Sequence, residues 1–357
     1  ENKSDWHFFE NLIKLLIYKY NLEICYLTSD RTEEIHFNHD VKFNQFYVGS
    51  GFFLIAIFQF LNAKLCLMTM GDLGNYHLKK NLNSVDPTKY IFLPHTPVSA
   101  HVIDNKNYYK NYDVVLCTGP QFYNEQKKME EVYGHKNKKL IKVGYLNFER
   151  MFDEKKNIEL KNKFQIPTDE ISCVLAPSWG ENMIVEKYCF KIIKNLVDNN
   201  IKVFFRPHPR SLKINKKIIT DIFQYFKNHK YFDYSPNISS LENMFESSIM
   251  ISDWSGAAIE YAIVFKKPVL FIDTPQKVKN HEYYKVNIEP LEKKIRSEIG
   301  LILNPNEVKN IHKEVIKLKE LNDKQKFNFN NIYEKNYYNS NKAQEICAQE
   351  IYKLHNK

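Results

Sequence analysis

Short apolar runs alternate along the chain with longer segments whose apolar residues recur every three or four positions. Runs of three to six apolar residues bounded by polar turns predict buried strands, and the longer spacing predicts amphipathic helices. The predicted strands lie at 23–28, 64–69, 90–93, 113–117, 173–176, 202–205, 249–251 and 269–272, and the clearest helices at 6–18, 184–197 and 217–226. Strands that alternate with helices are typical of parallel sheets built from βαβ units.

The same order of elements occurs twice, and 357 residues are too many for one typical core. The sequence therefore predicts an α/β protein of GT-B type, with two Rossmann-like domains whose parallel sheets face a central cleft. We expect the first domain over residues 1–145 and the second over 146–357, ending in a helical tail. An α/β domain normally opens with a strand, and this chain opens with a helix, so we expect residues upstream of Glu1.

The longest apolar stretch covers residues 51–68 and is interrupted by Gln59, Asn62 and Lys64. These polar interruptions favour a buried helix followed by a buried strand over a membrane span. The residues before the first predicted helix do not have the pattern of a signal peptide, so we expect none.

Composition narrows the class of protein. The net charge of +9 comes mainly from Lys scattered among Asn and Ile, without the Arg–aromatic interleaving or zinc-finger spacing of a nucleic-acid-binding protein. We therefore expect no nucleic-acid partner, although a mildly basic surface favours anionic headgroups or phosphate-bearing substrates. The cysteines at positions 25, 66, 117 and 173 lie in apolar runs, which is typical of small buried side chains in a reducing compartment.

Ligands of open α/β sheets bind outside the carboxyl ends of the strands, so the loops that follow the strands carry the candidate chemistry. The first such loop, Pro94-His-Thr-Pro-Val-Ser-Ala-His101, is stiffened by two prolines. His95 is a candidate general base because a histidine titrates near neutral pH, and Thr96 and His101 are candidate nucleotide or acceptor contacts. The alternative is a pair of surface or capping histidines.

A second loop, Arg206-Pro-His-Pro-Arg210, follows the strand at 202–205. Arginine binds phosphate through a bidentate fork, and His208 can donate a hydrogen bond or a proton. The loop is therefore a candidate phosphate site, with Arg206 and Arg210 as its cations. The alternative is a basic turn in a Lys-rich protein.

A third loop, Ser252-Asp-Trp-Ser-Gly256, stands where a predicted helix begins. Free backbone N–H groups and the helix dipole bind anions there, and the hydroxyls of Ser252 and Ser255 can add donors. An ordinary N-cap uses the same groups, so both interpretations stand. Glu260 is either a ribose contact or a solvated carboxylate, and Ser178, in the turn after the strand at 173–176, is a weaker phosphate candidate.

These cationic and helix-end groups can carry the charge of a leaving nucleotide without a metal. Because no carboxylate pair stands at a strand end, we expect neither a metal nor another cofactor.

The loops resemble motifs of the CDP-glycerol glycerophosphotransferase family, the teichoic-acid primases and polymerases with a GT-B fold. The resemblance covers about residues 85–275. The similar segments are Pro94-His-Thr-Pro97 (His-Gly-Thr-Pro in the family), Val143-Gly-Tyr-Leu-Asn147 (Gly-Tyr-Pro-Arg-x-Asp), Leu175-Ala-Pro-Ser-Trp179 (Ala-Pro-Thr-Trp), Arg206-Pro-His-Pro209 (Arg-x-His-Pro), and Ser239-Ser-Leu-Glu-Asn-Met-Phe245 with Ser252-Asp-Trp-Ser255 (Ser/Thr-Asp-Tyr-Ser-Ser). Gly256 stands where the last motif has its second serine.

The resemblance implies a reaction. His95 would accept the proton of an acceptor hydroxyl, which attacks the phosphate nearest the glycerol of CDP-glycerol or a related polyol donor. CMP would leave, held by His208 and Arg206 together with Ser252 and Ser255. The resemblance also implies an acceptor that is a cell-surface polysaccharide or its lipid-linked precursor, and a location in the cytoplasm, either free or peripheral at the inner face of the cytoplasmic membrane.

Three alternatives remain open on the sequence. A GT-B glycosyltransferase that uses a CMP- or UDP-sugar would need the same His, Arg and helix end at its diphosphate. A non-catalytic subunit of a surface-polysaccharide assembly complex would keep the fold but tolerate loss of His95. A UDP-sugar epimerase shares the two-domain fold but would need carboxylates opposite the sugar, and none can be placed.

Overall fold

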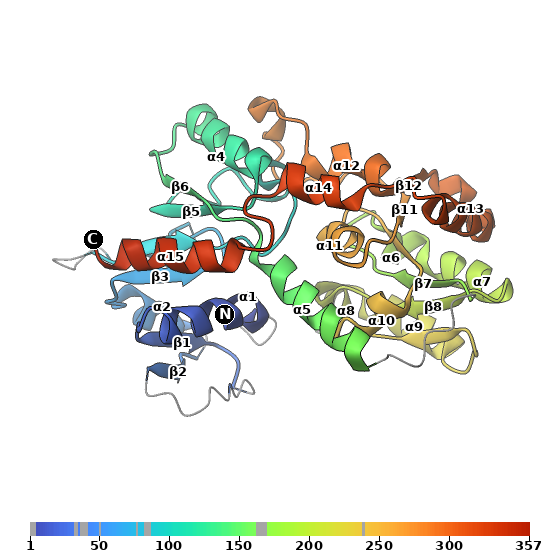
Figure 1. Cartoon of the computed structure of the whole chain (residues 1–357), viewed down its shortest axis with the longest axis horizontal. Coiled ribbons are helices and arrows are strands. Elements are labelled where there is room, and N and C mark those ends of the chain that lie inside the picture. The colour runs from blue at the N-terminus through green and yellow to red at the C-terminus, as the bar shows by residue number, and fades with distance from the viewer. Residues whose placement is uncertain are drawn as a thin grey trace. The chain divides into compact units, whose positions relative to one another are not determined.

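The computed structural model describes residues 5–31, 35, 42–49, 51–75, 78–81, 87–161, 170–237 and 240–357 (Figure 1). The chain forms two compact units. Unit 1 consists of 1–150, 279–288 and 336–357, and unit 2 consists of 151–278 and 289–335. Both contain parallel sheets with helices, as the alternation of elements predicted.

Unit 1 contains a four-stranded parallel sheet in the order β3-β4-β5-β6 and a separate parallel pair, β1-β2. Its strands are β1 Ile24–Thr28, β2 Phe43–Tyr47, β3 Leu65–Met68, β4 Lys89–Phe92, β5 Val114–Cys117 and β6 Lys139–Lys142. Its helices are α1 Trp6–Tyr18, α2 Phe52–Gln59, α3 Ala100–Ile103, α4 Pro120–Tyr133, the start of α5 Leu146–Lys161, the short 3₁₀ helix η1 Tyr283–Val286, and α15 Ala343–His355.

Helices α1 and α15 stand at opposite ends of the sequence and pack on each other (Figure 1). Leu12 and Leu16 of α1 recur at helical spacing and are buried in one cluster with Cys347 and Ile351 of α15. The expectation that the whole helical tail belongs to the second domain is therefore wrong, because the apolar face of α15 completes the core of unit 1. The division between the units falls at 150/151, within α5, rather than at 145/146.

Two glycines allow the returning chain to approach the sheet of unit 1. A Cβ on Gly119 would stand 1.8 Å from the carbonyl oxygen of Asn336. A Cβ on Gly144, whose φ is +99°, would stand 2.3 Å from the carbonyl oxygen of Tyr338. Any larger residue would push the 336–338 segment away from the ends of β5 and β6.

Unit 2 contains a six-stranded parallel sheet in the order β12-β11-β10-β7-β8-β9. Its strands are β7 Ser172–Leu175, β8 Lys202–Phe205, β9 Phe232–Tyr234, β10 Ile249–Ser252, β11 Val269–Ile272 and β12 Gly300–Leu303. Its helices are the rest of α5, α6 Ile184–Lys187, α7 Cys189–Asp198, α8 Pro209–Ile214, α9 Lys216–Phe226, α10 Glu242–Glu246, α11 Gly256–Phe265, α12 Leu291–Ile299, η2 Pro305–Asn310, α13 Ile311–Asp323 and α14 Phe329–Asn336, whose last residue falls in unit 1.

The strand order of unit 2 identifies its topological switch point. The chain enters at β7, runs outward through β8 and β9, and then returns to β10 on the other side of β7. This order is that of the Rossmann fold, in which ligands bind where the winding direction reverses. In unit 2 that position is between β7 and β10.

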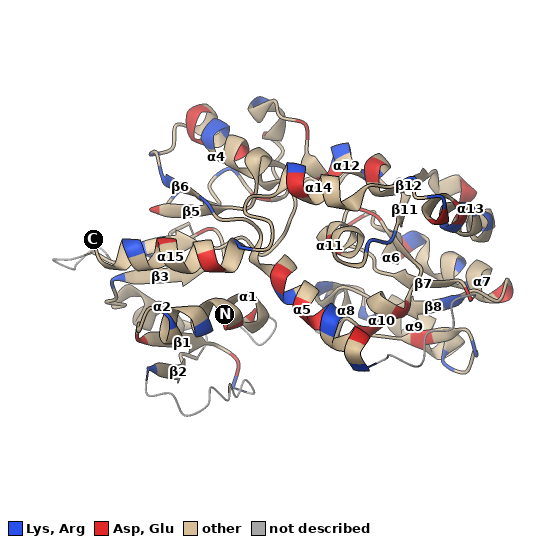
Figure 2. Ribbon diagram, in the orientation of Figure 1, with Lys and Arg blue, Asp and Glu red and all other residues tan. Residues whose placement is uncertain are grey.

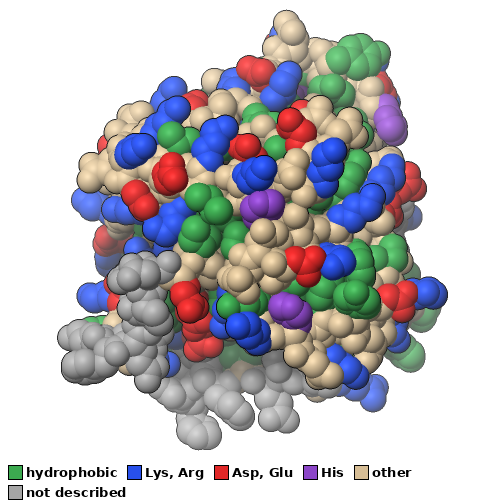
Figure 3. Space-filling view, turned by 90° about the vertical axis from the view of Figure 1, so that its right-hand side faces the viewer, with side chains coloured by type: hydrophobic (Ala, Val, Ile, Leu, Met, Phe, Trp, Pro, Cys, Tyr) green, Lys and Arg blue, Asp and Glu red, His purple; other side chains and the backbone are tan. Residues whose placement is uncertain are grey.

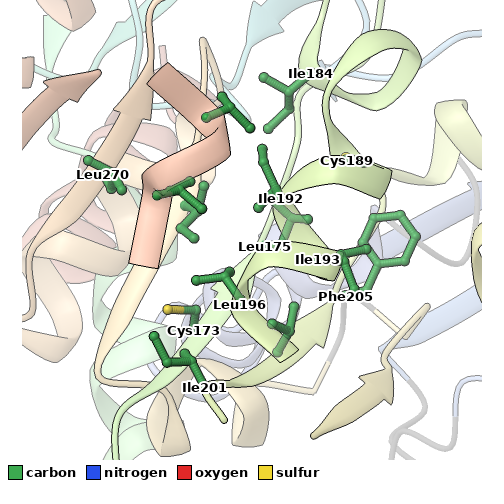
Figure 4. Packing of buried hydrophobic residues seen from close by; sticks show 14 of the residues in the cluster. Cys173, Leu175, Ile184, Cys189, Ile192, Ile193, Leu196, Ile201, Phe205 and Leu270 are labelled. Atoms are coloured by element: carbon green, nitrogen blue, oxygen red, sulfur yellow. The ribbon is translucent and has the colours of Figure 1, made fainter. Parts of the chain in front are cut away.

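The core of unit 2 fixes the strands that end at this switch point. Leu175 of β7 and Phe205 of β8 are fully buried against Ile192 and Leu196 of α7 (Figure 4). The helix predicted over 184–197 is interrupted at Tyr188 and becomes α6 and α7. Such a packed interior gives the loops that follow the strands a rigid base.

Two expectations about burial are wrong. Residues 51–68 do form a helix and a strand, but α2 is not buried: Phe52 is 78% exposed and Phe53 74% exposed, whereas Phe58 faces the core. The thiol of Cys25 lies on the exposed side of β1, and Cys66 is only half-buried. Within the described parts of the chain, no helix is long and apolar enough to cross a membrane.

Residues of both charges are distributed over the helices. Lys or Arg and Asp or Glu alternate along α5 and α13 (Figure 2). On the face shown in Figure 3, basic side chains are interspersed with acidic and hydrophobic ones. The described residues on this face form no continuous basic stripe, whereas such a stripe is typical of nucleic-acid-binding proteins.

Candidate functional site

Four loops of unit 2 follow neighbouring parallel strands and therefore meet at one edge of the sheet. They come after β7, β8, β10 and β11. The sequence predicted site residues in three of them, and the structure adds the fourth.

Asp253 joins two of these loops. It is 1% exposed. Its Oδ1 accepts a hydrogen bond from the backbone N–H of Ser178 at 2.8 Å, and its Oδ2 accepts one from Ile184 at 3.1 Å. Both oxygens are thus used to hold the loop after β7 against the turn after β10. We expected Asp253 among the phosphate ligands, but its carboxylate is buried and occupied, so it organises the site.

Ser252 also has a structural role. Its hydroxyl is fully buried and donates to the carbonyl of Ala176 at 2.7 Å, which closes the end of β10 onto the end of β7. The hydroxyl proton is therefore not available to a phosphate, and the expectation for Ser252 is wrong.

The N-terminus of α11 is the part of this turn that remains open. Ser255 is its N-cap, half-buried, and its Oγ accepts from the N–H of Ala257 at 3.3 Å while the hydroxyl proton can still donate. Gly256 begins the ten-residue helix and is also half-buried. Glu260 lies half-buried one turn further along. The helix end thus keeps the anion-binding character predicted from sequence.

Two hydroxyls flank this turn without a partner. Ser178 Oγ, in the loop after β7, and Thr274 Oγ1, in the loop after β11, are buried and make no hydrogen bond within the described residues. Thr274 also lies beside the turn, because its carbonyl accepts from the indole N–H of Trp254 at 2.9 Å. Buried hydroxyls usually have partners, so these two are ready to bind a ligand or water.

Arg206 lies inside the protein rather than at its surface. It is 7% exposed, and its Nη1 donates to the carbonyls of Asn237 at 3.1 Å and Ser240 at 2.8 Å. These bonds hold the segment that leads from β9 to α10. The expectation that Arg206 binds phosphate directly is therefore replaced by a structural role.

His208 and Arg210 lie at the surface of the same loop. The His208 Nδ1 accepts the backbone N–H of Arg210 at 3.1 Å, so Nδ1 carries no proton and the proton of the neutral ring is on Nε2. In the neutral ring, Nε2–H is therefore the donor of the His208 side chain. Its ring centroid lies 6.1 Å from that of Trp179.

The Trp179 indole brings in a residue that sequence analysis missed. Arg210 Cζ lies 3.9 Å from the ring centroid, and Lys277 Nζ lies 3.7 Å from it. Lys277 follows β11 by five positions. The signal that could have found it is its place in a loop after a predicted strand, the same criterion that selected Arg206.

In unit 1, the loop after β4 is tied down around His95. The hydroxyl of Tyr145 donates to the His95 carbonyl at 3.1 Å, and the hydroxyl of Tyr337 donates to the Pro97 carbonyl at 2.7 Å. The His95 ring contacts Phe8 edge-on, with centroids 6.1 Å apart. His95 and Thr96 stay half-buried. The loop thus presents His95 from a backbone held on both sides.

His101 is not a ligand contact. It is fully buried, its Nε2 lies 2.9 Å from the carbonyl oxygen of Ile288, and its Nδ1 lies 3.3 Å from Glu125 Oε1. The other carboxylate oxygen of Glu125 accepts the N–H of Ala100 at 2.7 Å. The expectation of a nucleotide or acceptor contact at His101 is wrong, because the ring is enclosed by α4 and the 279–288 segment.

Among the residues that the structure describes, no three His, Cys, Asp or Glu side chains gather as metal ligands would.

Comparison with known proteins identifies the family of the chain. The model of the family described as CDP-Glycerol:Poly(glycerophosphate) glycerophosphotransferase matches residues 91–346. No curated protein matches the chain in a sequence search.

Among solved structures, a wall teichoic acid polymerase, TagF, studied after a soak with CDPG, is similar with a TM-score of 0.58 at 14% identity, over 97% of this chain and 84% of that one. MnaA from S. aureus, in a structure with UDP, gives a TM-score of 0.61 at 13% identity, over 98% and 94% of the two chains. A UDP-GlcNAc 2-epimerase from Methanocaldococcus jannaschii gives 0.55 at 14%, over 97% and 96%.

At these identities the structural likenesses establish the fold alone, and they confirm the predicted α/β GT-B class. The family match extends over well more than half of the chain and includes the loops around His95, His208 and the start of α11. The chain therefore belongs to the CDP-glycerol glycerophosphotransferase family and is a transferase.

Proposed function

We propose that the protein transfers glycerol phosphate, or a related polyol phosphate, from a CDP-activated donor to a hydroxyl of a polysaccharide or lipid-linked acceptor, with release of CMP. The observation that carries the proposal is the edge of the sheet in unit 2. There His208 Nε2–H, Arg210, Lys277 and the N-terminus of α11 surround the topological switch point between β7 and β10.

In the proposed reaction, the acceptor oxygen forms a bond to the phosphorus nearest the glycerol while its proton passes to the His95 imidazole. The bond from that phosphorus to the bridging oxygen of CMP breaks, and the electron pair leaves with CMP. His208 donates a hydrogen bond from Nε2 to the departing phosphate, and Arg210 and Lys277 offset its charge. Positioning and charge stabilisation supply most of the acceleration in phosphoryl transfers of this kind.

A donor panel tests this proposal. The purified protein would be mixed with CDP-glycerol, CDP-ribitol, CMP-sugars and UDP-sugars, and thermal stabilisation and nucleotide release would be followed. Selective stabilisation by a CDP-polyol, with CMP released once a hydroxylated acceptor is added, supports the proposal. Response to a UDP- or CMP-sugar alone would make the protein a glycosyltransferase instead.

We also propose that α2 and its surroundings contact an anionic membrane surface, where a lipid-linked acceptor resides. Residues 46–70 carry seven large hydrophobic side chains that are at least 43% exposed: Phe46, Tyr47, Phe52, Phe53, Ile57, Phe60 and Met70. The net charge of +9 favours an anionic bilayer as their partner.

Flotation with vesicles tests this surface. The wild type should float with phosphatidylglycerol-containing vesicles and less with phosphatidylcholine alone, whereas Phe52→Ser/Phe53→Ser should float with neither. Phe190, which is 39% exposed on α7 of unit 2, gives the matched control Phe190→Ser, which should float as the wild type does. Equal flotation of all three proteins would refute the proposed surface.

A further inference from the structure

Two cations lie over one indole ring at the edge of unit 2. Arg210 comes from the loop after β8 and Lys277 from the loop after β11, and their charged groups lie 3.9 Å and 3.7 Å from the Trp179 centroid. Both distances are measured to the centroid of the Trp179 ring, so the two positive charges are at most about 8 Å apart. Like charges this close repel each other, and the electron-rich face of an indole is the best aromatic partner for such cations.

Trp179, Arg210 and Lys277 are far apart in the sequence, but the strand order brings their loops together. Trp179 follows β7, which lies between β8 and β10, and β11 lies beyond β10. The loops that carry Arg210 and Lys277 thus approach Trp179 from strands on opposite sides of β7. Gly180, with φ of +122°, follows the tryptophan, and a Cβ there would stand in ordinary contact, 3.8 Å from Lys277 Cε. The backbone therefore turns immediately beneath the lysine side chain.

We propose that Trp179 is a positioning residue for the donor diphosphate: its indole holds Arg210 and Lys277 beside His208, ready to bind the two phosphates. Lys277 is then a further phosphate ligand. The inference rests on the proposed function, because it takes the ligand to be a nucleoside diphosphate. It assigns the ring to the cations rather than to the nucleobase. The negative charge of a diphosphate bound between the two cations would attract both of them and offset their mutual repulsion.

The test separates phosphate from base. Titration calorimetry would measure inorganic pyrophosphate, cytidine, CMP and CDP binding to the wild type and to Trp179→Leu, Trp179→Phe, Lys277→Met and Arg210→Met. We expect Trp179→Leu and Lys277→Met to weaken pyrophosphate and CDP binding about tenfold or more, the scale of a charge-assisted hydrogen bond. In these variants, CMP binding should weaken less than CDP binding, and cytidine binding should not change. Trp179→Phe, which keeps an aromatic ring, should lose less affinity for pyrophosphate and CDP than Trp179→Leu.

Matched controls keep the result interpretable. Lys217, whose side chain is 89% exposed and paired with Asp221 on α9, gives Lys217→Met, the same loss of charge in the same unit. This variant should bind every ligand as the wild type does. Raising the salt concentration should weaken CDP binding less in Lys277→Met than in the wild type, because one ionic contact is gone. Thermal melts would verify that each variant is folded.

Other outcomes overturn the inference. If Trp179→Leu weakened cytidine and CDP equally, the ring would be a base contact. If all four test variants bound pyrophosphate and CDP as the wild type does, Trp179 and Lys277 would have no part in the site. UDP would be titrated in parallel: binding of UDP in place of CDP contradicts the proposed donor, while the pyrophosphate series still decides the role of Trp179. Failure of the wild type to bind pyrophosphate and both nucleotides would refute both proposals.

Discussion

Removal of the Asp253 carboxylate should loosen the candidate donor site more than any other single change at its edge. In Asp253→Ala, the backbone N–H groups of Ser178 and Ile184 lose their acceptor while they stay buried. Each orphaned donor costs about 1–3 kcal/mol, so we expect the free energy of unfolding of unit 2 to fall by about 4 kcal/mol. Asp253→Asn keeps one acceptor oxygen and turns an NH₂ toward the other donor, so it should lose about half as much.

Urea denaturation would measure this loss through tryptophan fluorescence. Trp179 and Trp254 belong to unit 2 and Trp6 to unit 1, so a Trp6→Phe background leaves reporters in unit 2 alone. Hydrogen exchange at the amides of Ser178 and Ile184 should accelerate in Asp253→Ala.

The control for Asp253 is Asp221→Asn, which removes a charge from an exposed pair on α9 and should change the unfolding free energy by less than about 0.5 kcal/mol. If Asp253→Ala cost no more than this control, or if the two amides exchanged at wild-type rates, the bridging role of the carboxylate would be refuted.

Three other changes have definite expected outcomes. His95→Ala should lower turnover by about 10² or more with an unchanged melting temperature, the scale of a lost general base, and near-normal turnover in a donor assay would contradict that role. Burial raises the Asp104 pKa to about 7, so the folded state keeps a proton that the unfolded state loses above about pH 4. The free energy of unfolding should therefore fall as pH rises from about 4 to 7, by about 2 kcal/mol after allowance for partial exposure, and Asp104→Asn should abolish the fall in urea titrations at several pH values. Gly119→Ala would place a Cβ against the Asn336 carbonyl and should cost about 2–4 kcal/mol in unit 1, measured by the Trp6 transition, whereas Gly134→Ala, with open space around it, should cost less.

The sequence was sufficient for the framework of the sheets because buried parallel strands are continuous apolar runs. The predicted strand at 202–205 coincides with β8, and the helix predicted over 6–18 with α1. Short or half-exposed strands such as β2, whose five residues Phe43–Tyr47 have no buried member, lack that signal and were missed. Exposure of α2 was likewise not predictable, because an apolar helix has the same composition whether or not a partner covers it.

At the candidate site, the sequence indicated which loops carry the chemistry but not which way each side chain points. Ser252 and Ser255 are three positions apart in one motif, yet the first donates to a carbonyl just after β7 and the second caps a helix. That difference depends on Ala176, which follows β7 and is distant in the sequence. The contact between Lys277 and Trp179 joins residues almost a hundred positions apart, so no local pattern contains it.

The pairing of α1 with α15 has a consequence for the order in which the protein folds during synthesis. The ribosome makes α1 before any of unit 2, but α15, the helix that covers it, is made more than 300 residues later, after all of unit 2. At a synthesis rate of roughly 5–20 residues per second, the apolar face of α1 therefore waits at least about 15 seconds for its native partner. Unit 2 has all of its own residues by position 335 and can fold first, while unit 1 exposes apolar surface that a chaperone can bind until α15 has been made.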